Sequence, residues 1–557
     1  MKKFLAVVAV LFCCTVVVFA GARSQSSGSS SGLTTIKMAY FGAAPAGVQS
    51  GYHWTDTLAT DLGIQLELVP SSQDNVKTML AARDFPEFIA NSSTADTADI
   101  IRAGLVQDLE PYRARLPNVF KWTGMIQFVK DNWSNNSGKV YAVRGGVGNT
   151  ASTVGVTWTA PYIRWDYYKE LGYPEITDLE DYLPVLKAML DRHPTNDAGQ
   201  KIYGFSLFSD WDSHIMALGD AFSGTIGKKT VGGYLEADVV TNATNSMLDD
   251  NSAYKRNLKF FFNANQMGLL DPDSPTQGYD TYREKAAAGR HILSLWWWGD
   301  DNLLNATELA AQGKGFKLVP FKNMKNTNNS TAPYVGSDTF YMINNKVEHL
   351  DKILEFLDYF YSPDGMMKLY YGPKGLVWDV DSNGEPYRTE FGWRYFNDRS
   401  TELPGGGGWS MTGYAWASNS PALQLWSTHP VWNRRLDGED WIKKDYSPQD
   451  SALVADWVRV MGAETDLEYL GKNNMLLTPS FAQLPATPED ILVLQQRVGA
   501  VVKPESWKAV YASSEAEFEA IWQKMVSDAK GLGVDTINQY YAEAYRKAVA
   551  DGARYVY

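Results

Sequence analysis

The chain has 557 residues, 45% of them hydrophobic, which is enough to bury large cores and to form at least two domains. Its 64 Asp and Glu outnumber its 51 Lys and Arg, and the formal net charge is −13. Because nucleic acids and anionic membrane surfaces repel a negative protein, this charge argues against both as partners. The 19 Trp are more than a core strictly needs, so we expect some to be displayed at the surface.

The N-terminus has the pattern of a secretory signal peptide. Lys2 and Lys3 precede an apolar run at residues 4–19 and three small residues, so we assign the signal to residues 1–22. Cleavage there removes both cysteines, Cys13 and Cys14, and leaves a mature chain without disulfides. Ala22 stands where a lipid-anchor signal needs a cysteine. The sequence therefore predicts a soluble, exported, periplasmic protein.

Residues 23–32 form a flexible Ser/Gly tether, and an alternation of strands and helices follows. This alternation indicates a parallel α/β sheet. Ligands on such sheets bind beyond the carboxyl ends of the strands, which singles out the loop at residues 42–51 and the loop after the third strand, with Asn91 and Ser92. The expected strands lie at residues 36–41, 65–69 and 87–90, and the expected helices at 54–62, 75–83 and 97–104.

A second α/β segment follows a glycine-rich stretch. Residues 145–149 are a candidate crossover between lobes, a helix is expected at 162–171, and Thr177-x-x-Glu180 is a candidate capping box. Residues 373–437 are rich in Gly, Pro and aromatics, including Trp416 and Trp432, and predict mostly loop with short strands. Further expected elements are strands at 140–144, 154–158, 292–295, 316–320 and 340–343 and a helix at 351–361.

The most informative stretch is the expected strand at 292–295, which runs into three indoles and two carboxylates: Trp296, Trp297, Trp298, Asp300 and Asp301. Aromatic faces beside carboxylates suit a sugar, whose C–H faces stack on rings while its hydroxyls donate to acidic oxygens. Side chains alternate along a strand, so Trp296 and Trp298 share one face and Trp297 takes the other. The alternative, that the indoles pack in a core, stays open.

The last part of the chain returns to regular helices. Ser514-x-x-Glu517 is a capping box, and apolar residues recur at helical spacing through 518–529 and again through 537–548. Both stripes predict packing faces.

The sequence also bears on calcium binding, on glycoside hydrolysis and on metal or nucleotide sites. The stretch from Asp379 to Glu390 fits an EF-hand calcium loop, but Asn383-Gly384 is also a strong hairpin turn, so calcium binding stays open. Asp210 and Asp212 around Trp211 could serve a glycosidase, although carboxylates so close in sequence rarely face each other across a bond. No His spacing or phosphate loop fits a metal or nucleotide site, so we expect no catalytic residue, no metal and no cofactor. A carbohydrate-binding protein that takes no part in transport is a further alternative.

Seven short stretches occur in a characteristic order along the chain. They are residues 83–88 (Arg-Asp-Phe-Pro-Glu-Phe), 103–111, 163–166 (Ile-Arg-Trp-Asp), 171–174 (Leu-Gly-Tyr-Pro), 287–290 (Ala-Ala-Gly-Arg), 361–365 (Tyr-Ser-Pro-Asp-Gly) and 507–511 (Trp-Lys-Ala-Val-Tyr). In this order they resemble the extracellular solute-binding proteins of sugar-type ABC importers, family 1, over nearly the whole mature chain. The resemblance implies an α/β, two-lobed periplasmic-binding-protein fold of type II, with hinge crossovers, that closes on a solute and presents it to membrane permease subunits.

On this basis we assign residues 33–150 and 294–336 to the N-terminal lobe and residues 151–293 and 337–470 to the C-terminal lobe, followed by a helical extension at 471–557. We expect a monomer. Where the family often carries an acidic cation loop, His193 and Lys201 replace acids, so no cation is expected. The expected ligand is a saccharide, and its expected contacts are Trp296, Trp298, Asp300, Asn91, Ser92, Asp210, Trp211, Trp416 and Trp432.

Overall fold

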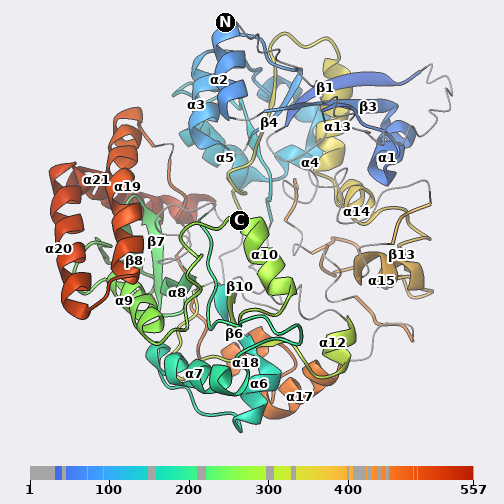
Figure 1. Ribbon diagram of the computed structural model, residues 1–557. Helices are drawn as coiled ribbons and strands as arrows, with labels where there is room; N and C mark the ends of the chain where they lie inside the picture. Colours follow the sequence, from blue (N-terminus) through green and yellow to red (C-terminus); the bar gives the residue numbers. More distant parts are fainter. Residues whose placement is uncertain are drawn as a thin grey trace, which may run out of the picture.

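A computed structural model gives the fold of the protein (Figure 1). Two separate hydrophobic cores organise it, and we call the parts built around them the first and second lobes. The structure describes residues 32–40, 46–71, 73–91, 93–148, 159–209, 221–296, 307–327, 334–397, 401–404, 422–424, 428–436, 438, 441–445, 451–480, 482–485 and 487–555.

The first lobe is built on a six-stranded sheet of order β2-β3-β1-β4-β12-β5. β1 pairs in parallel with β3 on one side and with β4 on the other, whereas β12 runs antiparallel to both β4 and β5. The strands alternate with helices in the chain, as predicted. They are β1 (Thr34–Tyr40), β2 (Gly47–Val48), β3 (Ile64–Pro70), β4 (Phe88–Asn91), β5 (Val143–Arg144) and β12 (Phe340–Ile343).

Helices from two distant parts of the sequence contribute to the first core. The predicted helix at 351–361 is confirmed and buries five apolar side chains. A small hairpin with a following helix packs at the side of this lobe. These elements are α1 (His53–Leu62), α2 (Gln73–Ala82), α3 (Thr94–Arg102), η1 (Glu110–Arg115), α4 (Pro117–Phe120), α5 (Thr123–Asn132), α13 (Leu350–Phe360), α14 (Pro363–Tyr371), β13 (Trp378–Val380), β14 (Pro386–Arg388) and α15 (Glu390–Asn397).

The second lobe contains two three-stranded sheets, of order β10-β6-β11 and β7-β8-β9. β6 is the central strand of the first of these and pairs antiparallel with both neighbours. The strands are β6 (Thr159–Arg164), β7 (Lys228–Gly232), β8 (Leu235–Asp238), β9 (Thr244–Ser246), β10 (Leu293–Trp296) and β11 (Phe316–Leu318).

Three long helices from the end of the sequence stack on the second lobe (Figure 1). Ser514 caps α20 by accepting from the Glu517 amide, which is one half of the predicted capping box, whereas the Glu517 carboxylate accepts from Ser513. The buried face of this helix carries Phe518, Trp522 and Met525. The helices of the lobe are α6 (Trp165–Glu170), η2 (Leu179–Asp181), α7 (Tyr182–Arg192), α8 (Ala221–Ser223), α9 (Ala253–Gln266), α10 (Tyr279–Ala287), α12 (Thr307–Ala311), α17 (Ala452–Met461), α18 (Asp466–Lys472), α19 (Glu489–Val510), α20 (Glu515–Gly531) and α21 (Val534–Gly552), followed by η5 (Ala553–Tyr555).

Strand pairing corrects the expected division of the chain between the lobes. β10 and β11 pair with β6 in the second lobe, although residues 294–336 were assigned to the N-terminal lobe. β12 and the helices that follow it belong to the first lobe, although residues 337–470 were assigned to the C-terminal one. Among the described residues, the chain passes between the cores from β5 to β6, from β11 to β12, between Trp441 and Leu453, and between Tyr545 and Tyr555.

Two local predictions also differ from the structure. The helix expected at 162–171 begins only at Trp165, because residues 162–164 are the end of β6 and bond to strands on both sides. The capping box lies one residue later than predicted, between Asp178 and Asp181. Backbone pairing with distant strands outweighs local helix propensity at such positions.

Among the described residues, no helix combines the length and the apolar composition that crossing a membrane requires.

Candidate functional site

The first half of the candidate site lies where the strand order of the first sheet reverses. β1 is flanked by β3 and β4, so the chain moves to one side of β1 and then to the other. In open α/β sheets, ligands bind outside the carboxyl ends of the strands at such a switch point. Asn91, predicted from sequence, is the last residue of β4 at this edge.

Asn91 holds its own loop in shape. Its side-chain oxygen accepts from the Ser93 amide at 3.1 Å, and its side-chain nitrogen donates to the Thr97 hydroxyl at 3.2 Å. The residue is only 2% exposed. These bonds position the turn between β4 and α3, and direct contact of Asn91 with a solute stays a prediction.

Asp96 is a candidate that the sequence prediction missed. Ser93 caps α3 by accepting from the Asp96 amide at 3.2 Å. In a full capping box the Asp96 carboxylate would accept from the Ser93 amide. Here the Ser93 amide donates to the Asn91 side chain instead. Oδ2 of Asp96 is buried and has no hydrogen-bond partner among the described residues. The capping spacing Ser93-x-x-Asp96 could have identified this residue from the sequence. The Asp96 carboxylate is therefore a hydrogen-bond acceptor at this edge.

The second half of the candidate site lies at one end of the β6 sheet. Trp296 of β10 is paired with Thr159, the first residue of β6. A neighbouring segment, residues 203–209, runs in the same direction as β10: Tyr203 bridges His291 in parallel, and Leu293 donates to Gly204. Both β10 and this segment therefore end at the same edge, immediately before the predicted residues Asp210 and Trp211 and the indole run.

The register of β10 weakens one argument from the sequence. The pairing with β6 shifts between Ser294 and Trp296, as at a β-bulge. A bulge interrupts the alternation of side chains between the two faces. Strand periodicity therefore does not decide which face of the sheet carries Trp296.

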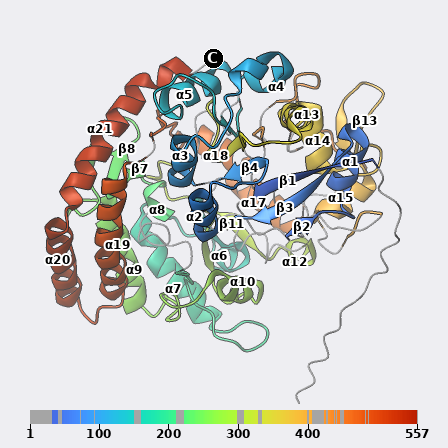
Figure 2. The same ribbon diagram turned by 90° about the horizontal axis from the view of Figure 1, so that it is seen from above.

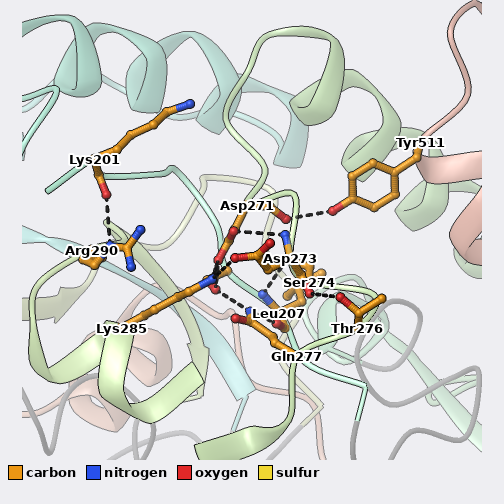
Figure 3. Close-up of polar contacts among 11 residues, drawn as sticks. Lys201, Leu207, Asp271, Asp273, Ser274, Thr276, Gln277, Lys285, Arg290 and Tyr511 are labelled. Carbon is orange, nitrogen blue, oxygen red and sulfur yellow. Dashed lines mark hydrogen bonds and ion pairs between the residues drawn. The ribbon is translucent and has the colours of Figure 1, made fainter. Parts of the chain in front are cut away.

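A loop from Asp271 to Gln277 fixes the segment that leads to Asp210 (Figure 3). Ser274 accepts from the Leu207 amide at 3.0 Å, and the Gln277 carbonyl accepts from the Ser209 amide at 3.1 Å. The Gln277 side chain donates to the Leu207 carbonyl as well. We call residues 271–277 the bracket, because they form hydrogen bonds with both ends of the segment 206–209.

A buried ion pair supports the bracket. The Lys285 ammonium lies 2.7 Å from Oδ2 of Asp271 and 2.9 Å from Oδ2 of Asp273, and Ser206 also donates to Asp271. Burial alone would raise the pKa of the Asp271 carboxyl, but the bonds from Lys285 and Ser206 outweigh burial and lower that pKa below its ordinary value. Asp271 is thus an anion that joins the bracket to Ser206.

The chain segments that pass between the lobes leave one edge and enter the other. At the first edge, Phe340 at the start of β12 pairs with both Asn91 and Arg144, the ends of β4 and β5. At the second edge, β6 starts and β11 ends beside each other, with the Val319 amide bonded to the Pro161 carbonyl. Two of the passages between the cores therefore run from the Asn91 edge to the Trp296 edge.

Trp432 packs in a cluster at the side of the first lobe. Its ring stacks on His429, with centroids 3.8 Å apart, and meets the rings of Trp378 and Trp441 at 5.3 and 6.0 Å. These contacts tie His429, Trp432 and Trp441 to the β13–β14 hairpin. Binding of a solute by Trp432 stays a prediction.

The remaining predicted contacts cannot be placed. The backbone of Trp296 lies in β10, but its side chain is outside the described part of the structure. Six further predicted contacts lie outside the described residues altogether: Ser92, Asp210, Trp211, Trp298, Asp300 and Trp416.

The two stretches considered for cations form ordinary protein contacts. The predicted hairpin at Asn383-Gly384 is confirmed by the pairing of β13 with β14, and Asp381 accepts from the Asn383 and Glu385 amides. In the other loop, His193 stacks on Tyr167 and lies 2.7 Å from Glu170. Within the described residues, no three His, Cys, Asp or Glu side chains are grouped to hold a metal ion.

No protein-family model matches the sequence, and no curated protein matches it either. Solved structures do match over nearly the whole chain. The alginate-binding protein AlgQ2 is 13% identical, with a TM-score of 0.59 over 92% of this chain and 98% of its own. FusA of S. pneumoniae, an ABC-transporter substrate-binding protein solved with fructo-nystose, is 14% identical, with a TM-score of 0.59 over 93% and 100%.

A third match is a human-milk-oligosaccharide (HMO) binding protein of an ABC transporter from Bifidobacterium longum infantis, 14% identical, with a TM-score of 0.55 over 92% and 99% of the two chains. With the strand topology, these likenesses show the two-lobed α/β fold of solute-binding proteins that the sequence predicts.

Proposed function

We propose that the protein binds a carbohydrate between its two lobes and delivers it to the permease of an ABC importer. One observation carries this proposal. Two strand-end edges, one in each lobe, are joined by the passages between the cores and lead directly into the predicted aromatic and acidic residues. The fold is shared with proteins that bind alginate, fructo-nystose and human milk oligosaccharides, which supports a saccharide as the ligand.

In this proposal the solute is held and not altered. Trp296 and Trp298 stack on sugar faces. Asp300 on the side of the second lobe and Asp96 on the side of the first accept hydrogen bonds from sugar hydroxyls. Closure of the lobes then expels water and presents a joint surface to the permease. The fold neighbours are binding proteins and not enzymes, which supports a role without catalysis.

Export belongs to the same proposal. The signal-like residues 1–22 direct the chain out of the cytoplasm, where an importer's binding protein meets its solute.

A thermal-shift screen of the full mature chain against a glycan panel tests the proposal. A ligand that binds only the folded protein raises the melting temperature, so at least one oligosaccharide is expected to do so, and to be recovered intact after incubation. If no glycan shifts the transition, or if the glycan is cleaved, the proposal is wrong.

Substitution then locates the site. The double variant Trp296→Ala/Trp298→Ala should lose the shift while the protein without glycan melts as before, because stacking contributes about 1 kcal/mol or more for each ring. The matched variant Trp296→Phe/Trp298→Phe keeps aromatic faces and should keep part of the shift. A folding defect in both variants would assign these indoles to a core.

A further inference from the structure

The helix α21 is anchored on the second lobe through a glycine turn. A Cβ at Gly232 would lie 2.3 Å from the ring of Tyr541, and one at Gly233 would lie 2.6 Å from Ile537. The turn between β7 and β8 can therefore approach α21 only because both residues lack a side chain. The Tyr234 amide also donates to Asn538 at 3.2 Å, which fixes the helix along this hairpin.

The residues directly after α21 are anchored on the first lobe instead. A Cβ at Gly124 of α5 would lie 2.1 Å from the Tyr555 carbonyl oxygen. The ring of Tyr555 meets that of Phe128 edge-on, with centroids 5.2 Å apart. Asp131 accepts from Arg554 at 3.0 Å and from the Tyr555 hydroxyl at 3.1 Å. Tyr555 is only 6% exposed and belongs to the first core.

The segment anchored on the second lobe and the segment anchored on the first lobe are consecutive helices. α21 is 19 residues long, about 28 Å at the helical rise, and η5 continues it without a break. Figure 2 shows the helix running along one side of the molecule and ending beside α5. We call α21 with η5, residues 534–555, the brace.

The foot of the brace, residues 553–555, is linked to the passages between the cores through Phe128. Phe128, which packs on Tyr555, also lies under the Arg144 guanidinium, 5.0 Å from the ring centre. Arg144 is fully buried and donates to the Ser337 carbonyl at 2.6 Å and to Asp338 at 2.5 Å. Ser337 in turn donates its amide to the Gly145 carbonyl. Contacts therefore lead without interruption from Tyr555 to both of the chain segments that leave the first sheet.

We propose that the brace opposes rotation of the lobes and thereby lowers the affinity for the solute. This inference rests on the proposed function, in which a solute closes the lobes. Closure moves α5 relative to the β7–β8 hairpin, and a rigid helix fixed to both cannot follow. The smaller contact, residues 553–555, must then be released. Its free energy is subtracted from that of binding, because a ligand shifts an equilibrium only by its differential affinity for the two states.

Two variants of the full chain release the foot of the brace by different routes. Arg554→Ala/Tyr555→Ala removes the side chains, and Gly124→Ala displaces the Tyr555 carbonyl while leaving residues 534–555 intact. Arg546→Ala, an exposed arginine on the same helix, is the control for lost charge. Release removes one aromatic pair and one partly exposed ion pair, so we expect both releasing variants to bind the glycan about fivefold more tightly than the wild type. Calorimetry measures this affinity, and the control should show no change.

The lobe arrangement gives a second readout that needs no solute. Spin labels on cysteines placed at the exposed Val48 and Val493 of the mature chain, in which Cys13 and Cys14 have been removed with the signal peptide, report the distance between the lobes. The releasing variants should broaden the distance distribution of the solute-free protein, and Arg546→Ala should not. Unchanged distances, or affinity that is unchanged or weaker, overturn the brace. A wild-type protein that binds no glycan overturns the proposed function, while the label distances still test the brace.

Discussion

The two edges of the candidate site are held in place by different kinds of interaction. At the first edge, Asn91, Ser93 and Asp96 form a cap and a turn within six residues of one another. At the second edge, residues 206–209 are held by the bracket and by Lys285, which lie 65 or more residues further along the chain. A locally held edge is visible in the sequence, whereas one held by distant residues is not. The second edge should also be the more sensitive to loss of a single side chain.

Loss of the buried cation should give the largest effect. Lys285→Met leaves the buried Asp271 carboxylate without its cation, and removal of one member of a buried ion pair costs about 3–5 kcal/mol. We expect the free energy of unfolding of the second lobe, measured in urea, to fall by that amount, and glycan affinity to fall with it.

The double variant Lys285→Met/Asp271→Asn sharpens this result. It removes both charges, so it should be more stable than Lys285→Met alone. A single variant that unfolds like the wild type would mean that the bracket does not depend on the ion pair.

Acid should act on the first lobe through a different group. Burial lowers the pKa of His53 to about 4, although the Leu369 carbonyl beside Nε2 partly opposes the shift. The ring is neutral in the folded protein but takes up a proton below about pH 6.5 when unfolded. Stability is therefore full above that pH and is lost as the pH falls toward 4, by about 3 kcal/mol.

Urea unfolding of the wild type at pH 7 and at pH 4 measures this loss. His53→Gln keeps a donor for the Leu369 carbonyl but does not titrate, so its first lobe should lose about 3 kcal/mol less over the same interval. Equal losses in the two proteins would assign the acid sensitivity to other groups.

The smallest effect is expected at the locally held edge. Asn91→Ala removes the acceptor of the Ser93 amide and should lower stability by about 1–2 kcal/mol, since a cap and a buried hydrogen bond are each worth about 1 kcal/mol. Asp96→Asn leaves the Ser93 cap in place. It should weaken glycan binding with little change in the urea midpoint, whereas Asn91→Ala should change both. Wild-type affinity in Asp96→Asn would remove Asp96 from the site.

Sequence patterns were reliable where one element decides its own structure. The first three predicted strands and helices and the helix α13 form within three residues of their predicted bounds, although the short strand β2 was not predicted. The Ser514 cap and the Asn383-Gly384 hairpin form as well, because period, cap and turn residues act over a few positions. They failed where a distant partner decides. The three residues before Trp165 join β6 because strands on both sides bond to them.

The candidate site divides in the same way. Asn91 was predicted from the carboxyl end of its strand, and Asp96 was detectable from its capping spacing. The role of the bracket was not detectable, because Asp271 and Gln277 have no motif that points to Ser206 or Ser209. The register shift in β10 likewise depends on its partner strand, so periodicity alone could not orient Trp296.

By itself the sequence determined the α/β class, the positions of the first strands and helices and of α13, and the aromatic and acidic run that marks a carbohydrate as the expected ligand. Only the tertiary structure decided which lobe each returning segment joins, that β12 lies between β4 and β5, and that Tyr555 reaches back to α5. The physical reason is range. Propensity, capping and periodicity are set by neighbours in the chain, whereas strand pairing, buried ion pairs and contacts between lobes are set by residues that meet only after folding.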